Sequence, residues 1–369
     1  MVQALKFILT TLLVLIVFLL AVSQLKNEKT SKVIGPDLEV ATIPIQKSGV
    51  NYSTKNIKQN DVNSETIIVC DTPVVPDDLI TAKDFNADSV ELPIQANSME
   101  MESQIANVLI FNSGDIKDSI KRLRQLKTKF SDNTLLSYDL LSSCTVPESE
   151  CDDSIFKNGV SLESQNGAVW LLSAINEINS NNIDAAISAL LEASSTPYYE
   201  GYWGDHLALF QEVFNQSGVE NSLPTQSDIS SYIASVPLPN FGPLVNFCKN
   251  IDADRADVLD ACLNIGLRLS NGEGTSLTHL IGLSLRKVIY ERYNDSAQVE
   301  QTAIERAKFM KIVSQSDAAN ALVWQSRQRT SDLIQRLKDF GEVAATEYIV
   351  EQAIRLSSDP DFDPCAVDW

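Results

Sequence analysis

Apolar side chains recur every three to four residues through most of the chain after residue 98. Ile116, Ile120 and Leu123 lie on one face of a predicted helix, and basic residues occupy its other face. The same spacing continues through 167–178 and 183–193, with the polar turn SNN between them. This pattern predicts an all-α fold built from stacked antiparallel helical hairpins, arranged either as a solenoid-like array or as an irregular bundle.

The last third of the sequence contains no proline between Pro243 and Pro360. Because proline is the main interruption of helices, this region is expected to be helical throughout. Asp254 and Ser316 fit as N-caps, and Gly341 fits as a terminator. The predicted helices cover 243–250, 254–270, 276–293, 296–313, 316–339 and 342–357.

Residues 7–22 form an uncharged apolar run whose length is intermediate between those of a cleaved signal peptide and a permanent membrane anchor. A cleaved signal peptide has an apolar segment of roughly 7–15 residues, and Ala21-Val22-Ser23 offers a cleavage site. A permanent anchor needs about 17–25 apolar residues, a length that residues 5–25 reach only by including Lys6 or Ser23 and Gln24. We expect an anchor in the inner membrane with the body in the periplasm; the alternative is secretion after cleavage near Ser23. Orientation stays open, because Lys26, Lys29 and Lys32 follow the run and favour a cytoplasmic body.

Composition and proline positions divide the remaining chain. Residues 26–64 are polar and Lys-rich, which is typical of a flexible linker. The predicted organisation is an anchor or signal at 1–25, a linker at 26–64, an irregular extended segment at 65–97, a hairpin region at 98–215, a proline-containing connection at 216–243, and a helical region with an acidic tail at 244–369.

Six cysteines follow the predicted export signal, and an even number there indicates a disulfide framework. Spacing favours the local pairs Cys144–Cys151 and Cys248–Cys262, which leaves Cys70 to join Cys365. The alternative is six unrelated buried thiols. No zinc or other metal site is expected, because the chain has no C-x-x-C pair and only two histidines.

Charge is distributed unevenly. The chain carries −20 overall, and residues 65–369 hold 22 basic and 45 acidic side chains, a net charge of −23. Such a body repels the phosphates of nucleic acids, so nucleic-acid binding is not expected. It also repels anionic lipid, whereas the Lys-bearing linker does not. Solubility is the simplest reason for this acidity.

Two helical hairpins within 99–193 share one pattern of apolar and small residues. Ile116 and Ile183 begin helices of similar pattern 67 residues apart. In the second hairpin, an aromatic, a small, a large and a small residue follow in turn at Trp170, Ala186, Leu190 and Ala193. By these residues, and by a spacing close to twice a roughly 34-residue repeat, the hairpins resemble tetratricopeptide repeats, from which Ser173 and Glu177 depart. The resemblance implies a concave surface that binds an extended protein or peptide. With its apolar leader and cysteine-stapled helices, the chain also resembles bacterial envelope proteins, which implies no particular activity.

The segment TPYYEGYW at 196–203 is the densest aromatic cluster in the chain. Aromatic rings beside carboxylates suit a sugar ring or a peptide side chain, although the cluster is also explained as a loop that caps the core. The candidate binding residues are Tyr198, Tyr199, Glu200, Tyr202, Trp203, Asp205 and His206.

No phosphate loop, nucleophile elbow or metalloprotease motif occurs in the sequence. We therefore expect no cofactor and no catalytic residue, and a protein that binds another protein or a peptide in the cell envelope. The alternative is an enzyme that acts on an envelope polymer such as peptidoglycan or polysaccharide, with Glu200, Asp205 and His206 as its acid–base groups.

Overall fold

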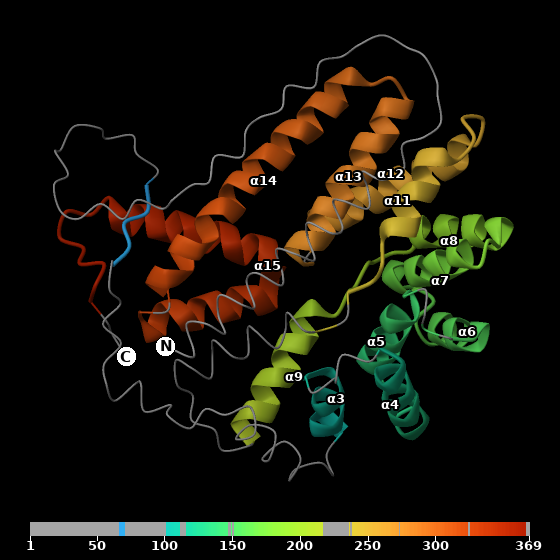
Figure 1. The fold of residues 1–369 in the computed structure, drawn as a ribbon, viewed down its shortest axis with the longest axis horizontal. Helices are drawn as coiled ribbons and strands as arrows, with labels where there is room; N and C mark the ends of the chain where they lie inside the picture. Colours follow the sequence, from blue (N-terminus) through green and yellow to red (C-terminus); the bar gives the residue numbers. More distant parts are fainter. Residues whose placement is uncertain are drawn as a thin grey trace. The chain divides into compact units, whose positions relative to one another are not determined.

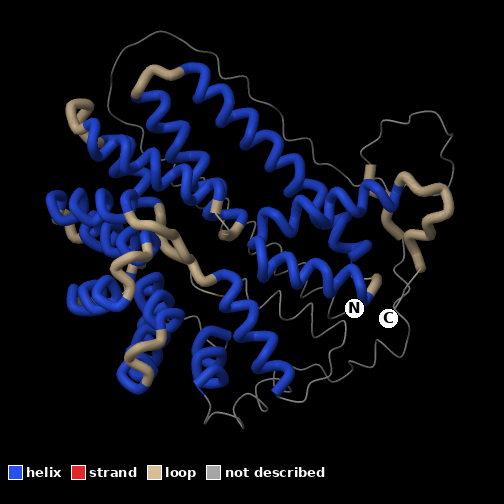
Figure 2. The backbone as a smooth tube through the Cα atoms, turned by 180° about the vertical axis from the view of Figure 1, so that it is seen from behind, coloured by secondary structure: helices blue, strands red, loops and turns tan. Residues whose placement is uncertain are grey.

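The computed structural model describes residues 66–70, 101–110, 116–146, 149, 151–216, 236, 238–272, 274–323 and 325–366. This part of the chain is helical and contains no strand (Figures 1 and 2). Its helices are α3 (Met101–Ile110), α4 (Ile116–Lys129), α5 (Thr134–Cys144), α6 (Asp153–Leu162), α7 (Gly167–Asn179), α8 (Ile183–Ser195), α9 (Trp203–Gln216), α11 (Gly242–Asn250), α12 (Ala256–Asn271), α13 (Ser276–Arg292), α14 (Ser296–Val323) and α15 (Arg327–Ser357). The predicted all-α class is confirmed.

The first hydrophobic cluster joins α3, α4, α5, α6 and α9. The centre of this cluster is α5, which the sequence pattern did not reveal as a helix. Residues 136–144 of this helix are all buried, including Ser137 and Asp139, so α5 has no polar face to produce an amphipathic pattern. Asn133 starts α5 by accepting a hydrogen bond from the backbone N–H of Leu136 at 2.7 Å.

A second cluster joins the α7–α8 hairpin to α11, α12 and α13. The α12–α13 contact is close because Gly266 of α12 faces Gly282 of α13. A Cβ atom on Gly282 would lie 2.4 Å from the backbone nitrogen of Ser270 and 2.7 Å from the carbonyl oxygen of Gly266. The absence of side chains at both positions therefore sets the distance between these two helices.

The third cluster is formed by α14 and α15, and it corrects the predicted helix boundaries. The predicted break near 313–316 is wrong: α14 continues to Val323, and the Ser316 hydroxyl donates to the carbonyl oxygen of Val313 within the helix. Gly341 does interrupt the helical backbone, with φ 78° inside α15. At this kink, the Glu342 carboxylate accepts the backbone N–H of Ser276 at the start of α13, at 2.9 Å.

Residues 66–70 lie against the third cluster, far along the sequence from the helices they contact. Ile67 and Val69 pack on it, and the backbone N–H of Ile68 donates to the Ser357 hydroxyl at 2.8 Å. The adjacent Cys70 forms a disulfide with Cys365, across 295 residues of sequence. This bond fastens the segment to the tail that follows α15.

All three expected disulfides are present: Cys70–Cys365, Cys144–Cys151 and Cys248–Cys262. Cys248 and Cys262 are fully buried and connect α11 to α12. The predicted anchor at 5–25 and linker at 26–64 lie outside the described residues. Within the described helices, none combines the length and apolar character needed to cross a membrane.

Candidate functional site

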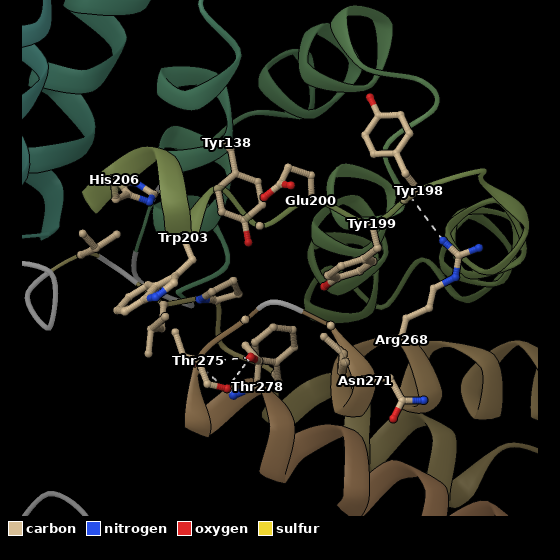
Figure 3. A pocket seen from close by; sticks show the side chains of 18 residues that line it. Tyr138, Tyr198, Tyr199, Glu200, Trp203, His206, Arg268, Asn271, Thr275 and Thr278 are labelled. Carbon is tan, nitrogen blue, oxygen red and sulfur yellow. Dashed lines mark hydrogen bonds between the residues drawn. The ribbon is translucent and has the colours of Figure 1, made fainter. Parts of the chain in front are cut away.

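A cavity of about 350 Å³ lies beside the aromatic segment, between the first and second hydrophobic clusters. Aromatic and apolar side chains supply much of its lining: Tyr138, Tyr198, Tyr199, Trp203, Val236, Leu238, Pro239, Phe241 and Leu269. Polar groups enter it from Glu200, His206, Arg268, Asn271, Thr275 and Thr278. In Figure 3, Trp203 and Tyr199 lie on opposite sides of the cavity.

The loop at 196–202 is held in place by Asn166, the fully buried N-cap of α7. Its side-chain oxygen accepts the backbone N–H groups of Ala168 and Glu200, both at 3.0 Å. Its amide nitrogen donates to the carbonyl oxygen of Glu200 at 3.1 Å. The Asn166 side chain therefore caps a helix and also fixes the backbone of the loop, because it satisfies both the backbone N–H and the backbone carbonyl of Glu200.

Tyr202 occupies the left-handed region of backbone conformation, with φ 59°, which an aromatic residue rarely adopts. The Glu200 carboxylate accepts the backbone N–H of Tyr202 at 2.6 Å, and the Tyr202 hydroxyl donates to Glu163. The Tyr202 ring contacts that of Tyr138, with ring centroids 5.3 Å apart. Such strain costs of order 1–3 kcal/mol and is concentrated at functional sites in proteins.

Arg268 connects α12 to the opposite end of the same loop. Its guanidinium donates to the carbonyl oxygen of Tyr198 at 3.3 Å (Figure 3). It also donates to the carbonyl oxygens of Ser194, at 3.2 Å, and of Thr196. These carbonyls include the C-terminal end of α8, where a cation is favoured by the helix dipole. The partly buried guanidinium of Arg268 thus holds the loop backbone, which makes it a structural part of the cavity wall.

The hydroxyls of the buried Tyr138 and the half-buried Tyr199 give the cavity neutral hydrogen-bond donors. Burial raises the pKa of Tyr138, with further increases from Tyr199 and from the charges of Asp139 and Glu200. Burial also raises the pKa of Tyr199, against the opposing charge of Arg268. Both hydroxyls therefore stay protonated at neutral pH, and each can donate to and accept from a ligand.

His206 lines the cavity and is paired with Asp139 on α5. The His206 Nε2 atom lies 2.8 Å from Asp139 Oδ1, and the two side chains are 2% and 0% exposed. Burial lowers the pKa of His206, but the charge and hydrogen bond of Asp139, with smaller contributions from Tyr202 and Asp205, raise it above its ordinary value. Asp139 therefore favours the protonated form of the imidazole, and the hydrogen bond between the two side chains connects α9 to α5.

The structure brings together five of the seven predicted binding residues in the cavity lining: Tyr198, Tyr199, Glu200, Trp203 and His206. Tyr202 is buried behind the lining, and Asp205 is exposed to solvent outside it. The sequence did not indicate Tyr138, Phe241 or Arg268, which reach the site from distant elements. Asn166 carried a recognisable signal, since an asparagine preceded the start of the predicted helix at 167.

No protein-family model, curated protein or solved structure matches this chain. The resemblance to tetratricopeptide repeats therefore stays a prediction. Across the described ranges, no cluster of three or more His, Cys, Asp or Glu side chains is arranged to hold a metal ion.

Proposed function

We propose that this is an exported or membrane-tethered helical protein of the cell envelope that binds another protein or a peptide. The cavity beside Tyr198–Trp203 receives one or two side chains of the partner. The observation that carries this proposal is the combination of aromatic walls with few polar groups in a concave space of about 350 Å³. Sites of this kind bind organic ligands and side-chain anchors in many proteins.

The loop that forms one wall supports the proposal because it is fixed before any ligand arrives. Asn166 holds the backbone of Glu200, and Arg268 holds the carbonyl groups that precede it. A preorganised wall loses little conformational freedom when a partner binds, so more of the contact energy contributes to affinity.

Binding is better supported than hydrolysis of an envelope polymer. Of the three acid–base groups that the enzyme alternative needs, Asp205 is outside the lining and His206 is paired with Asp139. The third, Glu200, accepts a hydrogen bond from the loop backbone. A glycosidase needs two carboxyl groups on opposite sides of the scissile bond, one of them available to protonate the leaving group.

Photo-crosslinking in cells tests the proposal. A photoreactive amino acid replaces Leu238, which lines the cavity and is 39% exposed, or Ile304 on α14, which is 56% exposed and outside the lining. We expect a discrete adduct with a defined envelope protein or peptide at position 238 and none of that mass at position 304. Equal adducts at both positions, or no adduct at 238, would contradict a binding site here.

The crosslinked segment is then synthesised and titrated against the full chain. Trp203→Ala removes an aromatic wall, and Phe340→Ala removes an aromatic side chain that is 52% exposed and outside the cavity lining. We expect Trp203→Ala to weaken binding at least about tenfold, as removal of a central aromatic anchor does. Phe340→Ala is expected to change affinity less than about twofold. Equal effects of the two substitutions would contradict the proposed location of the site.

A further inference from the structure

A second groove lies where the turn between α7 and α8 approaches α11. We call it the α11 groove. It has a volume of about 570 Å³, and none of the described residues that line it also lines the cavity beside Tyr198–Trp203. The hairpin contributes Ile178, Asn179, Asn181 and Ile183, and α11 with the turn after it contributes Pro243, Asn246, Phe247, Asn250, Ile251 and Asp252.

The fold fixes the wall of the groove that α11 supplies. Pro243, Asn246 and Asn250 occupy one face of α11, because residues three and four positions apart are neighbours on a helix. The disulfide between Cys248 and Cys262 joins α11 to α12, which restrains the rotation of α11. A groove with such a wall loses little conformational freedom when a ligand binds.

Apolar side chains form the floor of the α11 groove. Ile183 is 41% exposed, and the half-buried Ile178, Phe247 and Ile251 pack against the second hydrophobic cluster from outside. Apolar surface that is rimmed by polar groups marks interaction sites in soluble proteins. Covering this floor removes it from water, which favours a ligand with an apolar side chain.

Four asparagine amides accompany this floor. Asn179 donates to the carbonyl oxygen of Thr145 at 3.1 Å, and Asn250 donates to that of Asn246 at 2.8 Å. Within the described part of the chain, the exposed side chains of Asn181 and Asn246 make no hydrogen bond. An asparagine amide carries the same donor and acceptor as a peptide unit, so it can bond the N–H and the C=O of a peptide backbone.

The surroundings of the groove are acidic. Asp252 is the one charged residue in its described lining. The two segments that form the groove, 177–184 and 243–254, contain four acids and a single base, Lys249. Such a surface attracts basic ligands and disfavours phosphate and carboxylate groups.

We propose that the α11 groove binds an extended segment of a partner protein that has an apolar residue at its centre and lysine or arginine at its ends. The apolar side chain contacts the floor, the backbone bonds to Asn181 and Asn246, and the basic ends face the surrounding acids. A helix is a poorer fit, because its backbone N–H and C=O groups already bond to one another. Pro243 and Asn250 are about 10 Å apart along α11, which is the length of about three residues of extended chain.

Selection from displayed random peptides tests this site on the full chain. Peptides of about nine residues, long enough to cross the groove in extended form, are selected on the native chain. The selected pool is then bound to Asn246→Ala and, as a matched control, to Asn264→Ala, which removes an amide from an exposed position of α12 outside both linings. We expect a group of sequences that is lost on Asn246→Ala alone and has an apolar centre and basic ends. Peptides held by the cavity persist on both variants.

One peptide of that group is synthesised and titrated by fluorescence anisotropy. Asn246→Ala is expected to weaken its binding about tenfold, the effect of two lost hydrogen bonds. Asn181→Gly should do the same, since glycine keeps the left-handed backbone that Asn181 adopts, with φ 58°. Asn264→Ala should change affinity less than about twofold.

Methylation of the peptide's backbone nitrogens tests the hydrogen bonds on the native chain, so the result does not depend on how a variant folds. Successive N–H groups of an extended segment point to opposite sides. We expect methylation to weaken binding about tenfold at one or two alternate positions and to be tolerated at the positions between them.

Three results would overturn the proposal: no sequence lost on Asn246→Ala alone, lost sequences with acidic ends, or methylation tolerated at every position. A dimer of the full chain that Asn246→Ala dissociates would assign the groove to a second copy instead. All of these outcomes are independent of the cavity proposal, because the crosslinking test uses other residues on other elements.

Discussion

Replacing Asp139 by Asn tests whether the buried pair with His206 anchors α9 beside the cavity. The substitution keeps the shape of the side chain and removes its charge. In the native protein His206 Nε2 and Asp139 Oδ1 are 2.8 Å apart, and both side chains are almost completely buried. Breaking one partner of a buried ion pair costs about 3–5 kcal/mol, because the remaining charge has neither water nor a counter-ion. This is a large part of the 5–15 kcal/mol that typically stabilises a domain.

The loss of folding stability in Asp139→Asn should depend on pH. Since the pKa of His206 is raised in the folded protein, the stabilisation from the pair is fully present below the unfolded pKa of about 6.5. It is lost as pH rises through the folded pKa. In Asp139→Asn the carboxylate that raises the pKa of His206 is gone, and burial then disfavours the charged imidazole. The variant should therefore lose the most stability at acidic pH, where the native protein gains from the pair.

Urea unfolding followed by circular dichroism at about pH 5.5 and about pH 8.5 measures this effect. We expect Asp139→Asn to cost about 3–5 kcal/mol at the lower pH and about 1 kcal/mol at the higher pH, where a neutral hydrogen bond remains. The double variant with His206→Gln should recover part of the loss at low pH, because two amides can bond without charge. A penalty below about 1 kcal/mol at both pH values, or one that does not change with pH, would show that the Asp139–His206 pair does not anchor α9.

Three further predictions concern the packing and the loop. Gly282→Ala should destabilise the protein by about 1–3 kcal/mol, because the added Cβ meets backbone atoms of α12. Gly201→Ala is the control: its Cβ would lie 3.5 Å from the Tyr138 hydroxyl, so the unfolding free energy should change by less than about 0.5 kcal/mol. Thermal unfolding of the two variants compares these effects. Removing the disulfide with Cys248→Ala and Cys262→Ala should lower the unfolding free energy by about 3 kcal/mol in urea, and an unchanged midpoint would count against a stabilising bond. Asn166→Ala should weaken partner binding at least about tenfold while the helix content stays the same, since it releases the Glu200 backbone; unchanged affinity in titration would show that the loop needs no such anchor.

The sequence pattern predicted those helices that have one apolar and one polar face. The four helices at 116–129, 167–179, 183–195 and 276–292 were recovered within a few residues, because periodicity is strongest where one face meets water. Helix α5 was missed for the opposite reason. Its serines and Asp139 are buried together with its leucines, so polar residues do not mark a solvent-facing side and the sequence shows no amphipathic pattern. The break between α14 and α15 was misplaced because Ser316, a favourable cap, bonds instead to its own helix.

The candidate site was predictable only in its local part. Four aromatics between residues 198 and 203 indicated one wall of the cavity, and five predicted residues line it. The opposite wall comes from α12, α13 and the residues before α11, whose positions depend on tertiary packing such as the Gly266–Gly282 contact. The exposure of Asp205 and the pairing of His206 with Asp139 also depend on helix orientation, which residue composition does not specify.

Mass mapping of proteolytic fragments shows whether this helical body is exported and held together by disulfides. The protein is taken from cells with its thiols blocked, and its fragments are mapped under non-reducing conditions. We expect three linked fragment pairs, Cys70 with Cys365, Cys144 with Cys151, and Cys248 with Cys262, and no blocked thiol. Such a result would place the folded helical body in an oxidising compartment, where disulfides persist. Six blocked thiols in freshly isolated protein would contradict export of this protein to the envelope.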